Sequence, residues 1–156
     1  MQGFDREKFD AVWRRVTLCK TAPGASEDTE AGILRGLMDT VALGTCYCRA
    51  VAEKYPGRVS FCRVVRDNLR ISKRLRALYF IETGDTYHPD VVCEPFQTVS
   101  EGLRAVYSVT VNAAVSLSDA VEATRRSDFV GTYHETAELK YQHAATVGRM
   151  IEDLVR

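Results

Sequence analysis

The positions of the prolines constrain the fold of this chain more than any other feature. All four stand between segments of helical apolar periodicity, and none interrupts one: Pro23, Pro56, Pro89 and Pro95. Because proline lacks an amide hydrogen and breaks the interior of a helix, this placement is typical of long helices separated by loops. Apolar residues recur at intervals of three and four along four segments, which are residues 29–54, 60–83, 99–124 and 129–154. The sequence therefore predicts an all-α fold.

A shorter helix is expected at the N-terminus, within residues 1–20. Its apolar side would carry Phe4, Val12, Trp13 and Val16. The whole chain of 156 residues is close to the size of one average domain and is long enough to bury a core. A single domain over residues 1–156 is therefore predicted.

The lengths of the connections indicate how the four long helices are arranged. Residues 55–59 and 125–128 are short breaks, and a short loop makes its two helices antiparallel neighbours. The connection at 83–96 has roughly 15 residues, which reach about 50 Å when extended, whereas a 25-residue helix is about 37 Å long. It can therefore cross the bundle and link two helical hairpins, which is the ferritin-like four-helix arrangement. An up-down-up-down bundle is the alternative, because a long loop need not cross.

Charge and composition narrow the class of partner and the cellular compartment. Lys and Arg total 21, as do Asp and Glu, whereas a dedicated nucleic-acid-binding domain carries a basic excess. No apolar run approaches the roughly 20 residues that span a bilayer, so no membrane partner is expected. The first residues show no apolar region of a secretory signal, and five cysteines form no disulfide framework. We therefore expect a cytoplasmic protein with reduced thiols.

Two small groups of residues are interpreted as structural. Cys46 and Cys48 stand two positions apart on a predicted helix, so their side chains point about 200° apart and cannot bind one ion. His88 lies in the long loop near Asp85 and Asp90, which is too little for a metal-site prediction.

Five basic residues form a stripe on the segment 60–83, opposite its apolar side: Arg63, Arg66, Arg70, Lys73 and Arg74. With a net charge of zero, this stripe favours a solvated face or a subunit contact over nucleic-acid binding.

The segment RLRALYFIETGDTYHP, residues 74–89, resembles a stretch of bacterial rubrerythrin-like proteins, which belong to the ferritin-like superfamily. In that family a metal-binding helix ends in a Leu-x-Ala-Leu-Tyr-Phe run, followed by Thr-Gly and a Tyr-x-Pro loop. The Tyr-Phe and Thr-Gly elements match here. Helix order and loop lengths extend the similarity over about residues 28–156. The resemblance implies a ferritin-like fold and a homo-oligomer, with a dimer favoured.

The chemistry of the family depends on a di-metal centre, and the resemblance implies that its ligands are lost. The usual ligands are one Glu from each of two helices and a Glu-x-x-His pair from each of the other two. The apolar stripes place these positions at Thr40, Asn68, Ile71, Thr110, Lys140 and His143. Only His143 keeps its residue type, and Lys140 stands where a carboxylate would hold a cation. No metal cofactor and no catalytic residue are therefore expected.

An inward Lys140 needs acceptors, because an unpaired buried charge is costly. Asp39 and Asp67, each next to a vacated ligand position, are its expected ion-pair partners. The leading interpretation is a non-catalytic protein with a binding, scaffolding or regulatory role, in which a polar layer replaces the metals.

Two other functions stay open. An oxidoreductase or iron-handling protein would retain an iron or manganese pair through displaced ligands, namely Asp39, Asp67, Glu135, Glu138 and His143. A binder of a small anion would use the space between Thr40, Asn68, Thr110 and Lys140. That function requires a cavity on the order of a few hundred Å³.

Overall fold

The computed structural model describes residues 29–156, so the helix predicted within residues 1–20 lies outside the described part. The described part contains four α-helices and no strand, which confirms the all-α prediction. The helices are α2 (Glu30–Lys54), α3 (Cys62–Thr83), α4 (Val99–Ala123) and α5 (Ser127–Val155). No helix within these residues has the length and apolar character needed to cross a bilayer.

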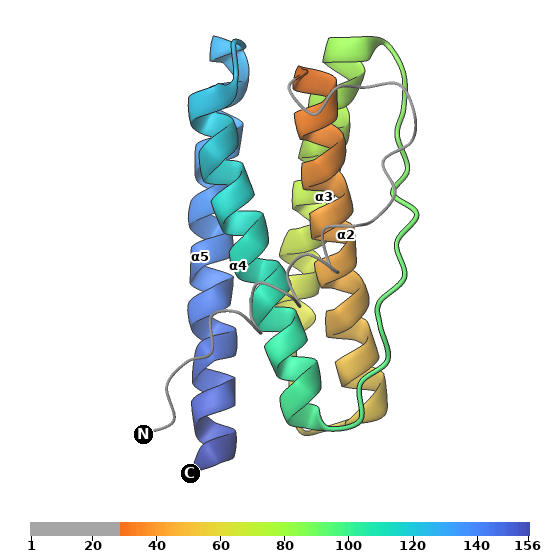
Figure 1. The fold of residues 1–156 in the computed structure, drawn as a ribbon, viewed down its shortest axis with the longest axis vertical. Helices are drawn as coiled ribbons and strands as arrows, with labels where there is room; N and C mark the ends of the chain where they lie inside the picture. The colour runs from red at the N-terminus through yellow and green to blue at the C-terminus, as the bar shows by residue number, and fades with distance from the viewer. Residues whose placement is uncertain (1–28) are drawn as a thin grey trace, which may run out of the picture.

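The helices pair as two antiparallel hairpins, α2 with α3 and α4 with α5 (Figure 1). Helix α2 also packs along α4, and α3 contacts α5. The segment 84–98 runs from the end of α3 along the bundle to the start of α4, at the opposite end (Figure 1). The long connection therefore crosses the bundle, and α3 and α4 point in the same direction.

Local interactions determine where this crossover begins and ends. Gly84 ends α3 in the left-handed conformation, with φ of 73°, and its amide donates to the Phe80 carbonyl at 2.8 Å. At the other end Thr98 and Glu101 form a capping box. The Thr98 hydroxyl accepts from the Glu101 amide at 3.1 Å, and the Glu101 carboxylate accepts from the Thr98 amide at 3.4 Å. These ends leave the segment between them free to follow α2.

Two apolar clusters fill the core, one toward each end of the bundle. The first includes Leu34, Val41, Ile71, Leu75, Leu117 and Tyr133. The second includes Val51, Phe61, Val64, Leu103, Val106 and Val147. Between the clusters lie the buried polar residues of α3 and α5, which include Asn68 and Lys140. The middle of the bundle is therefore a polar layer.

Candidate functional site

Lys140 lies at the centre of the polar layer. Its side chain projects from α5 and is 1% exposed. Its Nζ donates a hydrogen bond to Oδ1 of Asn68 on α3 at 2.5 Å. Asn68 is also 1% exposed, so this hydrogen bond joins two helices without competition from bulk water.

A second polar pair lies beside the first. Nε2 of His143 is 2.9 Å from Oδ2 of Asp67, and both residues are buried. Arg63 and Arg70 approach the same carboxylate from the surface, at 3.9 and 4.0 Å. Asp67 therefore connects a buried imidazole with two exposed guanidinium groups. Nδ1 of His143 is buried and has no hydrogen-bond partner among the described residues.

Helices α2 and α4 contribute small or weakly polar groups to the layer. A β-carbon on Gly44 would lie 3.9 Å from Nδ2 of Asn68, so this glycine faces the layer from α2. The hydroxyl of Thr110, on α4, donates to the Val106 carbonyl of its own helix at 2.7 Å. Within residues 29–156, Asp67 is the single buried carboxylate.

Burial determines which groups of the layer carry charge. Desolvation lowers the pKa of Lys140 to about 8, against the opposing effects of Cys48 and Asp67. Desolvation also raises the pKa of the Cys48 thiol to about 12, so this thiol is neutral at physiological pH. The pKa of His143 is lowered, again mainly by burial, although its hydrogen bond to Asp67 raises it. At neutral pH the layer therefore holds one buried ammonium group.

Four of the six positions expected to be vestigial metal-site residues are buried: Asn68, Thr110, Lys140 and His143. Lys140 is hydrogen-bonded to Asn68, and its charge acts on His143. Ile71 is buried in the neighbouring apolar cluster. Thr40 is half-buried, and its hydroxyl donates to the Gly36 carbonyl of its own helix. The α2 residue that faces Asn68 is Gly44, one turn after Thr40.

The predicted ion pair between Lys140 and Asp39 or Asp67 is wrong. Asp39 accepts a hydrogen bond from the Tyr87 hydroxyl at 2.8 Å, and Asp67 binds His143. The amide oxygen of Asn68 takes the place of a carboxylate at Lys140. Asp67 still acts over a longer distance, since its charge raises the pKa of Lys140.

The acids proposed as displaced metal ligands do not converge. Glu135 and Glu138 are exposed, and Glu135 forms an ion pair with Arg74 at 3.2 Å. Asp67 and His143 are the two members of that set that meet. No group of three or more His, Cys, Asp or Glu side chains in residues 29–156 is placed to hold a metal ion.

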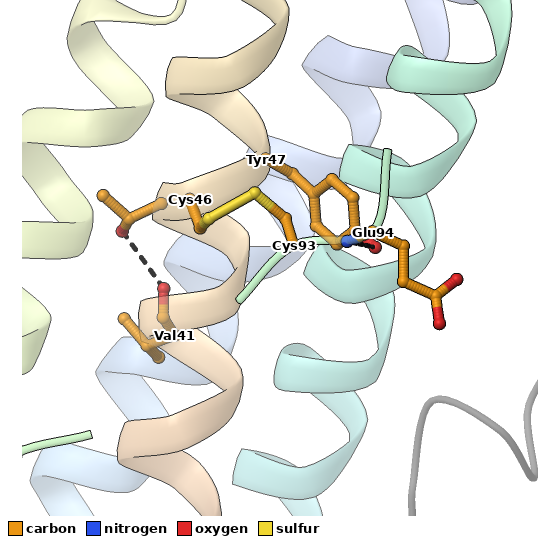
Figure 2. Close-up of a disulfide and its surroundings, with 6 residues drawn as sticks. Val41, Cys46, Tyr47, Cys93 and Glu94 are labelled. Carbon is orange, nitrogen blue, oxygen red and sulfur yellow. Dashed lines mark hydrogen bonds between the residues drawn. A yellow bond between two sulfur atoms is a disulfide. The ribbon is translucent and has the colours of Figure 1, made fainter. Parts of the chain in front are cut away.

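A disulfide fastens the crossover to α2. Cys46 is bonded to Cys93, with 6.0 Å between their α-carbons, and Figure 2 shows the bond between the helix and the crossover. Beside it the Tyr47 hydroxyl accepts from the Glu94 amide at 3.1 Å. The prediction of reduced thiols is therefore wrong for this pair. Cys48, buried, and Cys62, exposed, are free, while Cys19 lies outside the described residues.

Hydrogen bonds hold the crossover to α2 on both sides of the disulfide. Toward α3, the Tyr87 hydroxyl donates to Asp39. Toward α4, the Tyr55 hydroxyl donates to the Gln97 carbonyl at 2.8 Å, and Lys54 donates to the Phe96 carbonyl. A groove of about 540 Å³ lies beside the disulfide, between α2, α3 and the crossover.

The basic stripe of α3 is exposed along its length. Part of its charge is compensated at the surface, since Arg63 and Arg70 approach Asp67 and Arg74 pairs with Glu135. This stripe therefore lies outside the polar layer, and Arg63 and Arg70 approach the layer at Asp67.

A comparison with protein-family models gives no match for this chain, and searches of curated proteins and of solved structures give none either.

Proposed function

We propose that this chain is a non-catalytic ferritin-like protein in which a polar layer around Lys140 replaces an ancestral di-metal centre. It would act by binding, scaffolding or regulation, without a metal cofactor. The observation that carries this proposal is the position of Lys140. Its amino group is enclosed in the middle of the bundle and bonded to Asn68. Both residues stand where the family resemblance would put carboxylate ligands.

Charge in the layer is unsuited to a pair of divalent metals. Hard cations need several oxygen ligands with negative charge, and the described part of the layer offers one buried carboxylate, Asp67. A protonated Lys140 would repel a cation placed beside Asn68, and repulsion between buried charges is weakly screened.

The Thr-Gly element of the resemblance has a structural role in this chain. Gly84 supplies the left-handed residue that ends α3, and the Thr83 hydroxyl accepts from the Asp85 amide at 3.1 Å. The element thus helps to start the crossover. It supports a shared fold with the family and says nothing about shared metal chemistry.

Metal content tests the proposal directly. The protein is to be purified without an affinity tag from cells supplemented with iron and manganese, and then analysed for both elements. We expect less than about 0.1 ion per chain, compared with about two in an intact di-metal centre. Close to two ions per chain would overturn the proposal and would favour the alternative, an oxidoreductase or iron-handling protein that retains a metal pair.

The homo-oligomer is part of the same proposal, with α4 and α5 forming the contact in a dimer. Tyr107, Val115 and Tyr141 are exposed apolar side chains on these two helices. Tyr107 lies against Gly148, and the Tyr141 hydroxyl is 3.5 Å from that of Ser118, so both rings lie over the seam between the helices. Rings held in this way lose little conformational entropy when a second copy covers them.

Light scattering after size-exclusion chromatography tests the dimer. The double variant Tyr107→Lys/Tyr141→Lys is expected to be a monomer, whereas Ile81→Lys, at an exposed position on α3, should leave the dimer intact. A monomeric parent protein would contradict this part of the proposal.

A further inference from the structure

The Cys46–Cys93 disulfide is accessible from the groove between α2, α3 and the crossover. Both half-cystines are half-buried and line this groove, which has a volume of about 540 Å³. Cys46 comes from the helix and Cys93 from the extended crossover (Figure 2). A small molecule in the groove can therefore reach a sulfur atom of the bond.

The charges that line the groove favour an anion. Arg49 on α2 and Arg76 on α3 both border it, together with His88 from the crossover. Both arginines are exposed, and neither has an ion pair or a side-chain hydrogen bond within the described part of the chain. Glu53 is the one carboxylate among the described residues that line the groove. The two arginines would thus attract a molecule that carries two or more carboxylates. An amino group on the same molecule could pair with Glu53.

We propose that this groove binds a small thiol that carries carboxylates, the chemical class of glutathione, and that the bound thiol exchanges with the Cys46–Cys93 disulfide. The thiolate sulfur attacks Sγ of Cys93 and forms a new S–S bond. The Cys46–Cys93 bond breaks, and its electron pair leaves on Sγ of Cys46 as a thiolate. One disulfide is consumed and one is formed, so the exchange needs no other oxidant or reductant.

Arg49 sets the direction of the exchange. It follows Cys46 by three residues on α2, so the two side chains share one face of the helix, and both line the groove. A nearby guanidinium stabilises a thiolate, and a thiol that ionises more easily is the better leaving group. Cys46 therefore leaves, and the small thiol stays on Cys93.

The crossover can accept this modification without loss of the bundle. Hydrogen bonds to α2 hold it on either side of Cys93, through Tyr87 and through the backbone near Gln97. The exchange would thus loosen the middle of the crossover and leave its two ends in place.

The test measures the initial rate of mixed-disulfide formation in the oxidised protein. The background variant Cys19→Ser/Cys62→Ser removes two other thiols, and the reaction is trapped with acid and followed by intact mass and peptide mapping. Three probes are compared at equal thiolate concentration and low salt: glutathione, uncharged 2-mercaptoethanol and cationic cysteamine. We expect glutathione to react fastest and the adduct to lie on Cys93.

Charge variants identify the groove as the binding site. Arg49→Gln/Arg76→Gln should slow glutathione by about tenfold more than it slows 2-mercaptoethanol. Loss of Arg49 beside the leaving sulfur slows both thiols, whereas only the anion also loses an attraction to the groove. The control Arg104→Gln/Arg125→Gln alters two exposed arginines outside the groove and should change neither rate. Equal thiolate-normalised rates for all three probes, or an unchanged rate in the groove variant, would overturn the proposal. An adduct on Cys46 would overturn the stated direction.

Discussion

Lys140 Nζ donates to Asn68 Oδ1 at 2.5 Å, inside a bundle where both side chains are 1% exposed. Asn68 is neutral, so the nearest partner of the buried ammonium does not neutralise its charge. The balancing charge belongs to Asp67, the preceding residue, which is bonded to His143. The four side chains therefore behave as one electrostatic unit, and a change in one alters the free energy of the others.

Replacing Lys140 should destabilise the fold by an amount that depends on charge. Lys140→Glu would put a second carboxylate near Asp67 and is expected to lower the free energy of unfolding by about 3–5 kcal/mol. Lys140→Met keeps most of the volume and leaves the Asn68 oxygen without its donor, which should cost about 1–3 kcal/mol. Urea denaturation measures both.

Glu138→Gln is the matched control, because it changes an exposed charge on the same helix. Its effect should stay within about 0.5 kcal/mol. If Lys140→Glu unfolds at the same urea concentration as the parent protein, Lys140 is exposed to water and the polar layer does not exist as described.

Restoring the lost ligands should restore metal binding. The triple variant Asn68→Glu/Ile71→His/Lys140→Glu would place a Glu-x-x-His pair on α3 and complete another with His143 on α5. We expect this variant to bind at least about one Co²⁺ per chain and to be stabilised by the ion through mass action. Visible absorption of Co²⁺ and the melting temperature with and without the ion provide two readouts.

The double variant Asn68→Glu/Lys140→Glu serves as its control, since it adds the same carboxylates without the second histidine. Weaker Co²⁺ binding is expected, because imidazole is a good ligand for this metal. A folded triple variant that binds no metal would show that these positions do not face one another as a ligand set.

The apolar periodicity and the positions of the prolines were sufficient to predict the four long helices. They were not sufficient to predict the partners of the buried polar groups. The Thr98–Glu101 capping box lies within four consecutive positions, so a sequence shows such a pattern directly. The apolar stripe placed Asn68 on the inner side of α3, and Asn68 is buried. The expectation that a buried ammonium pairs with a carboxylate pointed to the adjacent Asp67, whereas the acceptor in the structure is the amide oxygen of Asn68.

Two other features were not predicted from the sequence: which α2 residue lies level with Asn68 along the bundle axis, and which path the crossover follows. Thr40 and Gly44 lie one turn apart on the same helix, and no local pattern indicates which of them is level with Asn68. The disulfide joins residues separated by 47 positions, and the second of them lies in a segment without regular structure. Periodicity carries no information about the path of such a segment, so the pairing of Cys46 with Cys93 could not be foreseen.

Stability should rise with pH above neutrality because of Lys140. Its pKa is lowered from 10.5 to about 8 by burial, so the unfolded chain binds more protons than the native state between these two values. The free energy of unfolding therefore increases with pH, by roughly 3 kcal/mol over that range. Below pH 8 the native state carries the full cost of the buried ammonium.

The difference in unfolding free energy between the parent protein and Lys140→Met isolates this effect, because the contributions of the other titrating groups are common to both proteins. The gap in unfolding free energy should grow in favour of the parent protein as the pH is raised from 7 to 10. A gap that is constant over this range would mean that the pKa of Lys140 is not lowered in the native state.

The disulfide should contribute to stability by constraining the unfolded chain. It closes a loop of 47 residues, and a loop of this size is expected to stabilise a protein by about 2–4 kcal/mol. Reduction with a neutral phosphine should therefore lower the urea midpoint of the parent protein, while helical circular dichroism is retained because the crossover keeps its hydrogen bonds through Tyr87 and Tyr55. The variant Cys46→Ser/Cys93→Ser should start at the lower midpoint and show no response to the reductant. If reduction leaves the urea midpoint of the parent protein unchanged, either the two sulfur atoms are not bonded in solution or their bond does not contribute to stability. Titration of free thiols on the same sample distinguishes these two cases.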